Sequence, residues 1–130
     1  MKTIKTMTIS RSVEISDEDI MDIMCSAIEG GIGYWACLDN SGKEWADDNP
    51  ASETAAKILL DGGTVRFLDD ENRKTEYLLT LDKLCNGIQK YITESPEILD
   101  DNNHIECGEV DTIVADMMVQ YAIFGEVMFS

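Results

Sequence analysis

Basic residues are scarce in this chain, and none lies beyond Lys90. The 130 residues include 26 Asp and Glu but only 10 Lys and Arg, which gives a formal net charge of −16. Residues 91–130 contain nine carboxylates and no Lys or Arg. Direct binding to nucleic acid or to an anionic membrane requires cationic contacts. The shortage of cations therefore argues against both as direct partners.

The chain also lacks a long apolar run, an export signal and a Cys-x-x-Cys pair. No apolar stretch approaches the ~20 residues that span a bilayer, and residues 1–16 have no signal-peptide core. We therefore expect a cytoplasmic protein whose four dispersed cysteines are reduced thiols. Hydrophobic residues make up 44% of the chain, which is enough for one globular domain covering residues 1–130.

The first third of the chain predicts a strand followed by an amphipathic helix. Residues 3–9 alternate and are rich in β-branched types, which predicts a strand with its odd-numbered side buried. Ser16 is a candidate N-cap, with Asp19 completing a capping box. Gly30 and Gly31 are expected to end the helix, one of them in a left-handed conformation. Its apolar stripe consists of Ile20, Ile23, Met24, Ala27 and Ile28.

Similar signals predict the rest of the fold. Pro50 suits the start of a second helix that ends at residues 62–63, and residues 64–68 and 75–81 read as an antiparallel hairpin. Thr80 can cap a third helix. The chain therefore predicts a single α+β domain, with three to four helices packed on a small, mostly antiparallel sheet.

The two remaining elements lie around residues 32–38 and at the C-terminus. Residues 32–38 can form a strand or an aromatic loop. A final helix is expected to stop at Gly125, and residues 127–129 are apolar enough for a short strand. The stripe of that helix is predicted to be Val110, Ile113, Val114, Met117, Tyr121 and Phe124.

No motif carries a complete catalytic or metal-binding set. Residues 31–36 match G-x-G-x-x-A, but they follow a helix, whereas a dinucleotide motif lies between a strand and a helix. Residues 100–111 begin like a calcium loop but lack its glycine and its final Glu. His104 and Cys107 could hold zinc only with a second pair of ligands, and none is present. We therefore predict no metal, no cofactor and no enzyme activity.

Exposed carboxylates are the remaining candidates for a functional surface. Helical neighbours at i and i+4 lie about 6 Å apart, close to the phosphate spacing of a nucleic-acid strand. An acidic surface can therefore occupy the groove of a basic nucleic-acid-binding protein. The alternative is that these charges only keep the protein soluble. The predicted partner-binding residues are Glu18, Asp22, Glu29, Asp47, Asp48, Asp69, Asp70 and Glu71.

Several segments together resemble a family of small acidic proteins from bacteriophages and mobile elements of Gram-positive bacteria. The most specific string is Glu-Gly-Gly-Ile-x-Tyr-Trp at residues 29–35, and the others lie at residues 62–67, 79–83 and 120–126. The resemblance implies a host bacterial cytoplasm and an anti-defence role such as anti-CRISPR inhibition, with a CRISPR effector as the basic partner. It implies no catalytic or binding residue.

Two other functions remain open at this point. A sponge for a nucleotide immune signal would stack a base on Tyr34 and Trp35, with Arg66, Arg73 and Lys74 as its cationic group. A structural or assembly protein of a phage would instead pair residues 127–129 across a homodimer.

Overall fold

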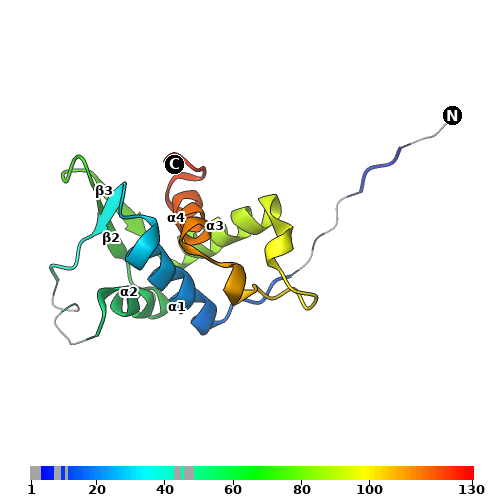
Figure 1. The fold of residues 1–130 in the computed structure, drawn as a ribbon, viewed down its shortest axis with the longest axis horizontal. Helices are drawn as coiled ribbons and strands as arrows, with labels where there is room; N and C mark the ends of the chain where they lie inside the picture. The colour runs from blue at the N-terminus through cyan, green and yellow to red at the C-terminus, as the bar shows by residue number, and fades with distance from the viewer. Residues whose placement is uncertain (1–3, 8–9, 11, 43–44, 46–48) are drawn as a thin grey trace.

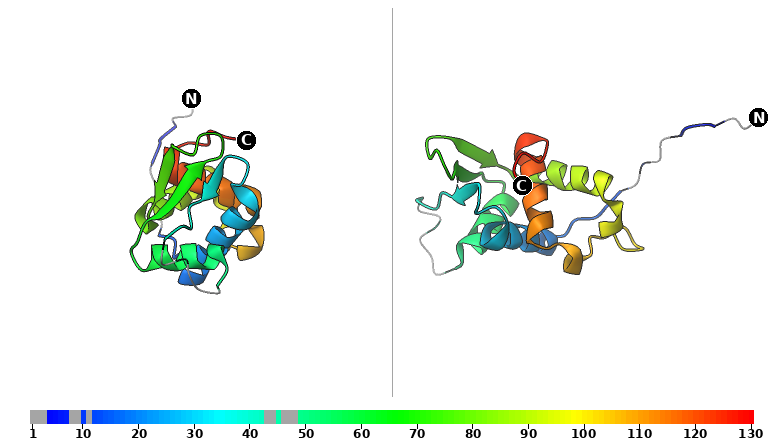
Figure 2. Two further views of the ribbon diagram at one scale, coloured as in Figure 1. Left: turned by 90° about the vertical axis from the view of Figure 1, so that its left-hand side faces the viewer. Right: turned by 45° about the horizontal axis from the view of Figure 1, so that its top comes forward.

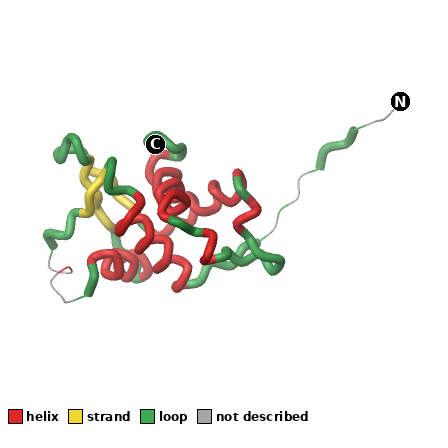
Figure 3. Tube along the Cα trace, viewed as in Figure 1, coloured by secondary structure: helices red, strands yellow, loops and turns green. Residues whose placement is uncertain are grey.

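The sheet lies at one end of the molecule, and helices form most of the rest (Figure 1, Figure 3). The computed structural model describes residues 4–7, 10, 12–42, 45 and 49–130, which form a small single-domain α+β fold. None of the described helices combines the length and apolar character that crossing a bilayer requires. The elements are α1 (Asp17–Ser26), the π-helical η1 (Ala27–Gly31), β1 (Ala36–Leu38), α2 (Ala51–Leu60), β2 (Val65–Asp69), β3 (Glu76–Leu79), α3 (Leu81–Glu94), the short 3-10 helices η3 (Pro96–Ile98) and η4 (Cys107–Glu109), and α4 (Thr112–Phe124).

The three strands form an antiparallel sheet in the order β1-β2-β3 (Figure 2). The predicted hairpin is confirmed, with Phe67 opposite Tyr77 in the β2–β3 register. Val65 and Phe67 are fully buried, whereas Arg66 between them is exposed. One side of the sheet therefore contributes to the core, which it shares with all four described α-helices.

The short-range helix signals are confirmed. The Ser16 hydroxyl accepts the Asp19 N–H at 3.0 Å, and the Asp19 carboxylate accepts the Ser16 N–H at 3.0 Å, which completes the capping box. Thr80 caps α3 by accepting the Lys83 N–H. Gly125 ends α4 with φ of 76°, a conformation that glycine adopts without strain. Each of these signals involves residues only a few positions apart.

The prediction that Gly30 or Gly31 is left-handed is wrong, because neither has a positive φ. Instead, α1 continues into the π-helical turn η1, which packs against the start of α4. A Cβ on Gly30 would lie 2.8 Å from Thr112 Cγ2, and one on Gly31 would lie 2.7 Å from the Thr112 carbonyl oxygen. Close packing against backbone therefore explains Gly31, whereas a side chain at position 30 would require the Thr112 side chain to move.

The predicted N-terminal strand is absent from the described residues 4–7, while residues 3, 8 and 9 lie outside the description. Residues 4–7 extend away from the helices (Figure 1, Figure 2), and 77% of Met7 is exposed, although the odd-numbered side was expected to be buried. An alternating β-branched segment forms a stable strand only with a partner for its backbone groups. Val13 and Ile15, nearer to α1, do pack against the core.

The predicted apolar stripe of α4 is confirmed in part, because Val110 is buried and Val114, Met117, Tyr121 and Phe124 pack against the core. Ile113 is 68% exposed, whereas the polar Asp116 and Gln120 are buried. Apolar residues cover most of the circumference of this helix, so its packing against α3 and η1 decides which side is buried. The predicted strand at 127–129 is also absent.

Candidate functional site

The carboxylates predicted on α1 are exposed. Glu18 and Asp22 lie on the solvent side of the helix, which contains four carboxylates and no basic residue. Glu29, on η1, is also exposed, and it accepts a hydrogen bond of 2.8 Å from the Ser52 hydroxyl of α2. The first two side chains are available to a partner, and the third is held against a neighbouring helix.

The carboxylates after β2 are arranged differently. The half-buried Asp69 accepts the Tyr77 hydroxyl at 2.5 Å and the N–H groups of Glu71 and Asn72 at 2.9 Å. The Tyr77 hydroxyl and these backbone donors lower the pKa of Asp69. Asp70 and Glu71 are exposed. Asp69 therefore shapes the hairpin turn and leaves two carboxylates to face solvent.

The predicted partner-binding residues that the structure describes fall into two groups, one on α1 and η1 and the other in the hairpin turn after β2. The Asp70 N–H donates to the Trp35 carbonyl oxygen at 3.0 Å, which places the hairpin turn beside residues 32–35. Glu18 lies in the first turn of α1, at the other end of that helix. Asp47 and Asp48 lie outside the described residues.

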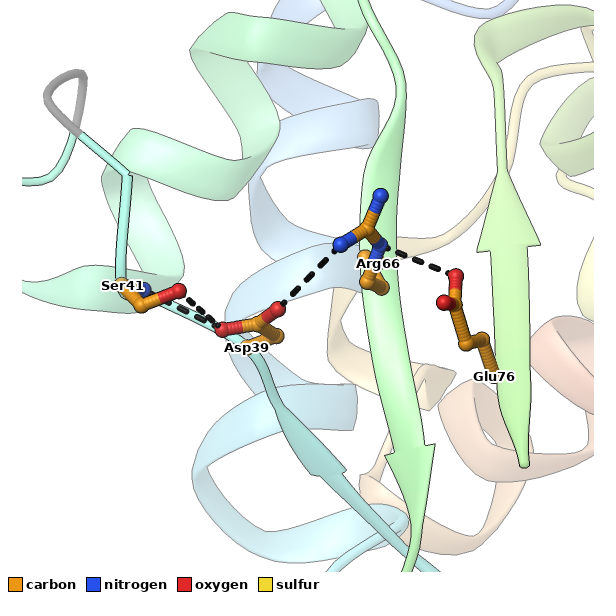
Figure 4. A network of polar contacts seen from close by, with 4 residues as sticks. All are labelled: Asp39, Ser41, Arg66 and Glu76. Atoms are coloured by element: carbon orange, nitrogen blue, oxygen red, sulfur yellow. Dashed lines mark hydrogen bonds and ion pairs between the residues drawn. The ribbon is translucent and has the colours of Figure 1, made fainter. Parts of the chain in front are cut away.

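Arg66 is paired with carboxylates on both of its sides (Figure 4). Its guanidinium nitrogens lie 3.1 Å from Glu76 and 3.7 Å from Asp39. Hydrogen bonds from Ser41, together with Arg66, lower the pKa of Asp39. Neighbouring carboxylates repel a phosphate, so Arg66 is a poor phosphate ligand in this arrangement.

A buried polar network joins the turn after η1 to α4. The Asp116 carboxylate accepts the Tyr34 hydroxyl at 2.6 Å, Trp35 Nε1 at 2.8 Å and Gln120 Nε2 at 2.9 Å. No buried side-chain nitrogen or oxygen in the described residues lacks a partner. An ionised carboxylate can only accept hydrogen bonds, so the NH₂ group of the Gln120 amide must face Asp116.

The other end of the Gln120 amide binds the C-terminal tail, residues 126–130. Gln120 Oε1 accepts the N–H groups of Met128 and Phe129, both at 2.8 Å. Gln120 Nε2 also donates to the Phe129 carbonyl oxygen at 3.1 Å. The tail is thus held through its backbone although it forms no strand.

Trp35 lies at the centre of an aromatic cluster and is only 3% exposed. The Phe129 ring stacks on it with a centroid distance of 5.2 Å and an interplanar angle of 4°. Phe124 and Tyr77 contact Trp35 at 5.5 and 5.7 Å. Trp35 therefore packs in the core, and its stacking face is filled by the tail rather than open to a base. Tyr34 remains half exposed.

Two tyrosines donate to carboxylates, and both have raised pKa values. Burial and the Asp116 carboxylate raise the pKa of Tyr34 to about 12, because its hydroxyl lies against Asp116 although half of the residue is exposed. The hydrogen bond to Asp69, followed by burial, raises the pKa of Tyr77 to about 12.

We expect both phenols in the folded protein to remain neutral until well above pH 10. In the unfolded chain, a tyrosine has its ordinary pKa of about 10. Since the folded pKa is the higher one, the neutral phenols contribute stability below pH 10, and this contribution is lost between pH 10 and about 12. Phenolate absorbance measured against pH, with Tyr34→Phe and Tyr77→Phe to assign each transition, tests this. Titration of either group at about 10 in the folded protein would contradict it.

The acidic loop after α3 does not assemble a cation site in the described residues. Asp100 accepts the N–H groups of Asn102 and His104 at 2.8 and 3.0 Å, and these backbone donors lower its pKa. Within the described parts of the chain, no three His, Cys, Asp or Glu side chains are placed to hold a metal ion. The Asp100 carboxylate serves to close a turn.

Sequence reasoning missed Asp116 and Gln120. A signal was present, because these are the only residues apart from Tyr121 with polar side chains between 113 and 124, and they lie four positions apart. Two polar side chains on one side of an apolar helix indicate a buried, mutually satisfied pair.

No family model, curated protein or solved structure matches the chain.

Proposed function

We propose that this protein is a non-enzymatic anti-defence inhibitor that binds the cationic groove of a nucleic-acid-binding host protein. The observation that carries the proposal is the exposed acidic side of α1, where Glu18 and Asp22 lie one turn apart on a helix without basic residues. Such a surface releases counterions from a basic groove in the way that phosphates do.

The charge balance of the described residues supports this proposal. Among them, Arg66 pairs with Asp39 and Glu76, and the His104 imidazole lies 3.4 Å from Glu14. Because 26 Asp and Glu face only 10 Lys and Arg, pairing one to one within the chain would leave most carboxylates without a cation. A basic partner would relieve that repulsion. The phage setting that the resemblance implies makes a CRISPR effector the first partner to test.

The test uses purified CRISPR effector nucleases loaded with guide RNA, with binding and DNA cleavage measured at several salt concentrations. We expect the affinity to fall at least about tenfold between roughly 50 and 200 mM salt. Glu18→Lys/Asp22→Lys should weaken binding by a further factor of about ten or more, since each reversed contact replaces attraction with repulsion.

The matched control is Asp101→Lys/Glu106→Lys, which changes the net charge by the same amount at two exposed positions outside α1. Circular dichroism would verify that both variants remain folded. Binding that is independent of salt, or equal weakening by the two double variants, would reject the acidic side of α1 as the interface.

A further inference from the structure

The C-terminal tail occupies a slot formed by Trp35, Phe124 and Gln120, here called the aromatic slot. The ring of Phe129 lies parallel to Trp35 and 5.8 Å from the Phe124 ring. By contrast, 58% of Met128 is exposed. One aromatic side chain therefore supplies most of the side-chain contact between the tail and the slot.

The remaining contacts go to the backbone of the tail. Gln120 accepts two successive N–H groups and donates to one carbonyl oxygen, at 2.8, 2.8 and 3.1 Å. Every non-proline residue has these same backbone groups. The aromatic slot thus recognises features that any extended peptide with one suitably placed aromatic residue can offer.

The residues that form the aromatic slot have contacts with one another and with the core besides those to the tail. Asp116 holds both Trp35 Nε1 and Gln120 Nε2, so the stacking surface and the amide are oriented by the same carboxylate. Phe124 also packs on Tyr77, with centroids 5.1 Å apart. The walls therefore have supporting contacts of their own, and this preorganisation lowers the cost of binding a ligand.

The tail, in turn, is attached at a point where the backbone can rotate. It follows Gly125, whose φ of 76° ends α4, and Glu126 and residues 127–128 are exposed. The exposed Lys90 Nζ donates to the Gly125 carbonyl oxygen, so a rotation at Gly125 that frees the tail also breaks this surface hydrogen bond. Glycine reaches both signs of φ at low cost, so the tail can leave while α4 stays in place.

We propose that the aromatic slot is a peptide-binding site for a partner segment that presents an aromatic residue in extended backbone, and that the tail is a tethered occupant which this segment displaces. With a tethered occupant, the apparent affinity for an outside ligand equals the intrinsic affinity multiplied by the fraction of molecules whose slot is open. This site is separate from the acidic side of α1 and does not depend on the inhibitor proposal.

The test supplies the tail in trans, as the acetylated peptide Glu-Val-Met-Phe-Ser. The protein is the full chain carrying Phe129→Ala, which removes the ring of the tail from Trp35, and Trp45→Phe, which leaves Trp35 as the only tryptophan. Short tethers give effective concentrations in the millimolar range, so a docked tail implies half-saturation by the free peptide at about 1 mM or below. We expect a saturable change in Trp35 fluorescence, at least tenfold weaker when Phe129 is present.

Three control ligands are tested on the same protein variant. A peptide with Phe replaced by Ala should not bind, and one methylated on the Phe nitrogen should bind about tenfold or more weakly, since it cannot donate to Gln120. Adenosine tests a heteroaromatic ligand. The proposal is overturned if the folded Phe129→Ala protein shows no saturable peptide binding, if Phe129 does not affect affinity, if N-methylation has no effect, or if adenosine binds where the peptide does not.

Discussion

Gly87→Ala is expected to lower the free energy of unfolding by about 2–4 kcal/mol. Gly87 is buried where α3 packs against α4. A Cβ there would lie 2.6 Å from the Ala122 nitrogen and 2.8 Å from its Cα, and nearer still to the Met118 carbonyl oxygen. These are backbone atoms, so no side-chain rotation can relieve the overlap and the two helices must separate.

Helix propensity favours alanine over glycine at this position. Its size relative to the cost of the overlap decides whether Gly87→Ala raises or lowers the free energy of unfolding. Alanine is favoured over glycine in a helix interior by about 1 kcal/mol, which is less than the cost of separating two packed helices. Urea denaturation measures the difference. The matched control is Gly33→Ala, where the added Cβ has no neighbour within 4 Å. A Gly87→Ala protein as stable as the wild type would show that the close approach of α3 and α4 is not required.

Asp116→Ala is expected to cost about 2–4 kcal/mol, because it removes the common acceptor of three donors. Trp35 Nε1 is the most affected, since its residue is 3% exposed and Asp116 is the partner that the structure gives it. Tyr34 and Gln120 retain their mutual hydrogen bond of 3.3 Å, and half of Tyr34 is open to water. The missing carboxylate also leaves a small cavity.

Asp116→Asn separates hydrogen bonding from simple loss of volume. An amide oxygen can still accept from Trp35 and Gln120, while its NH₂ group meets the Tyr34 hydroxyl, which can turn to accept. We therefore expect Asn to cost about 1 kcal/mol and Ala clearly more. Asp22→Ala, at an exposed position, should change stability by less than about 0.5 kcal/mol. If Asn and Ala are equally destabilising, the hydrogen bonds to Trp35 and Gln120 are not the source of the effect.

Local signals in the sequence were sufficient for most of the helices and for the hairpin. Ser16, Thr80 and Gly125 act on backbone groups within four residues, so their roles could be predicted without knowledge of the fold. The N-terminal segment shows where local preference fails. Residues 4–7 favour a strand, yet no strand in the described part of the chain pairs with them.

The features that the sequence did not predict depend on contacts between distant segments. Gly30 and Gly31 match the pattern of a conformational stop, but it is the start of α4, some 80 positions later, that leaves no room for a Cβ on Gly31. The burial of Asp116 and Gln120 was not predicted either, because apolar residues surround most of α4 and its contacts with other elements decide which side faces inward. The two exposed groups of carboxylates could be read directly from the sequence, whereas the distribution of hydrogen bonds within them could not.

The polar partner of Trp35 has a consequence for folding during synthesis. Its acceptor, Asp116, follows 81 residues later, and its stacking partner Phe129 lies further still along the chain. At about 5–20 residues per second, a ribosome needs roughly 4–16 s to cover that separation. During this interval the nascent chain exposes an unpaired indole beside an incomplete core. The cluster around Trp35 can therefore complete its packing only after Asp116 and Phe129 have been synthesised, and a chaperone has a defined period in which to bind the preceding part of the chain.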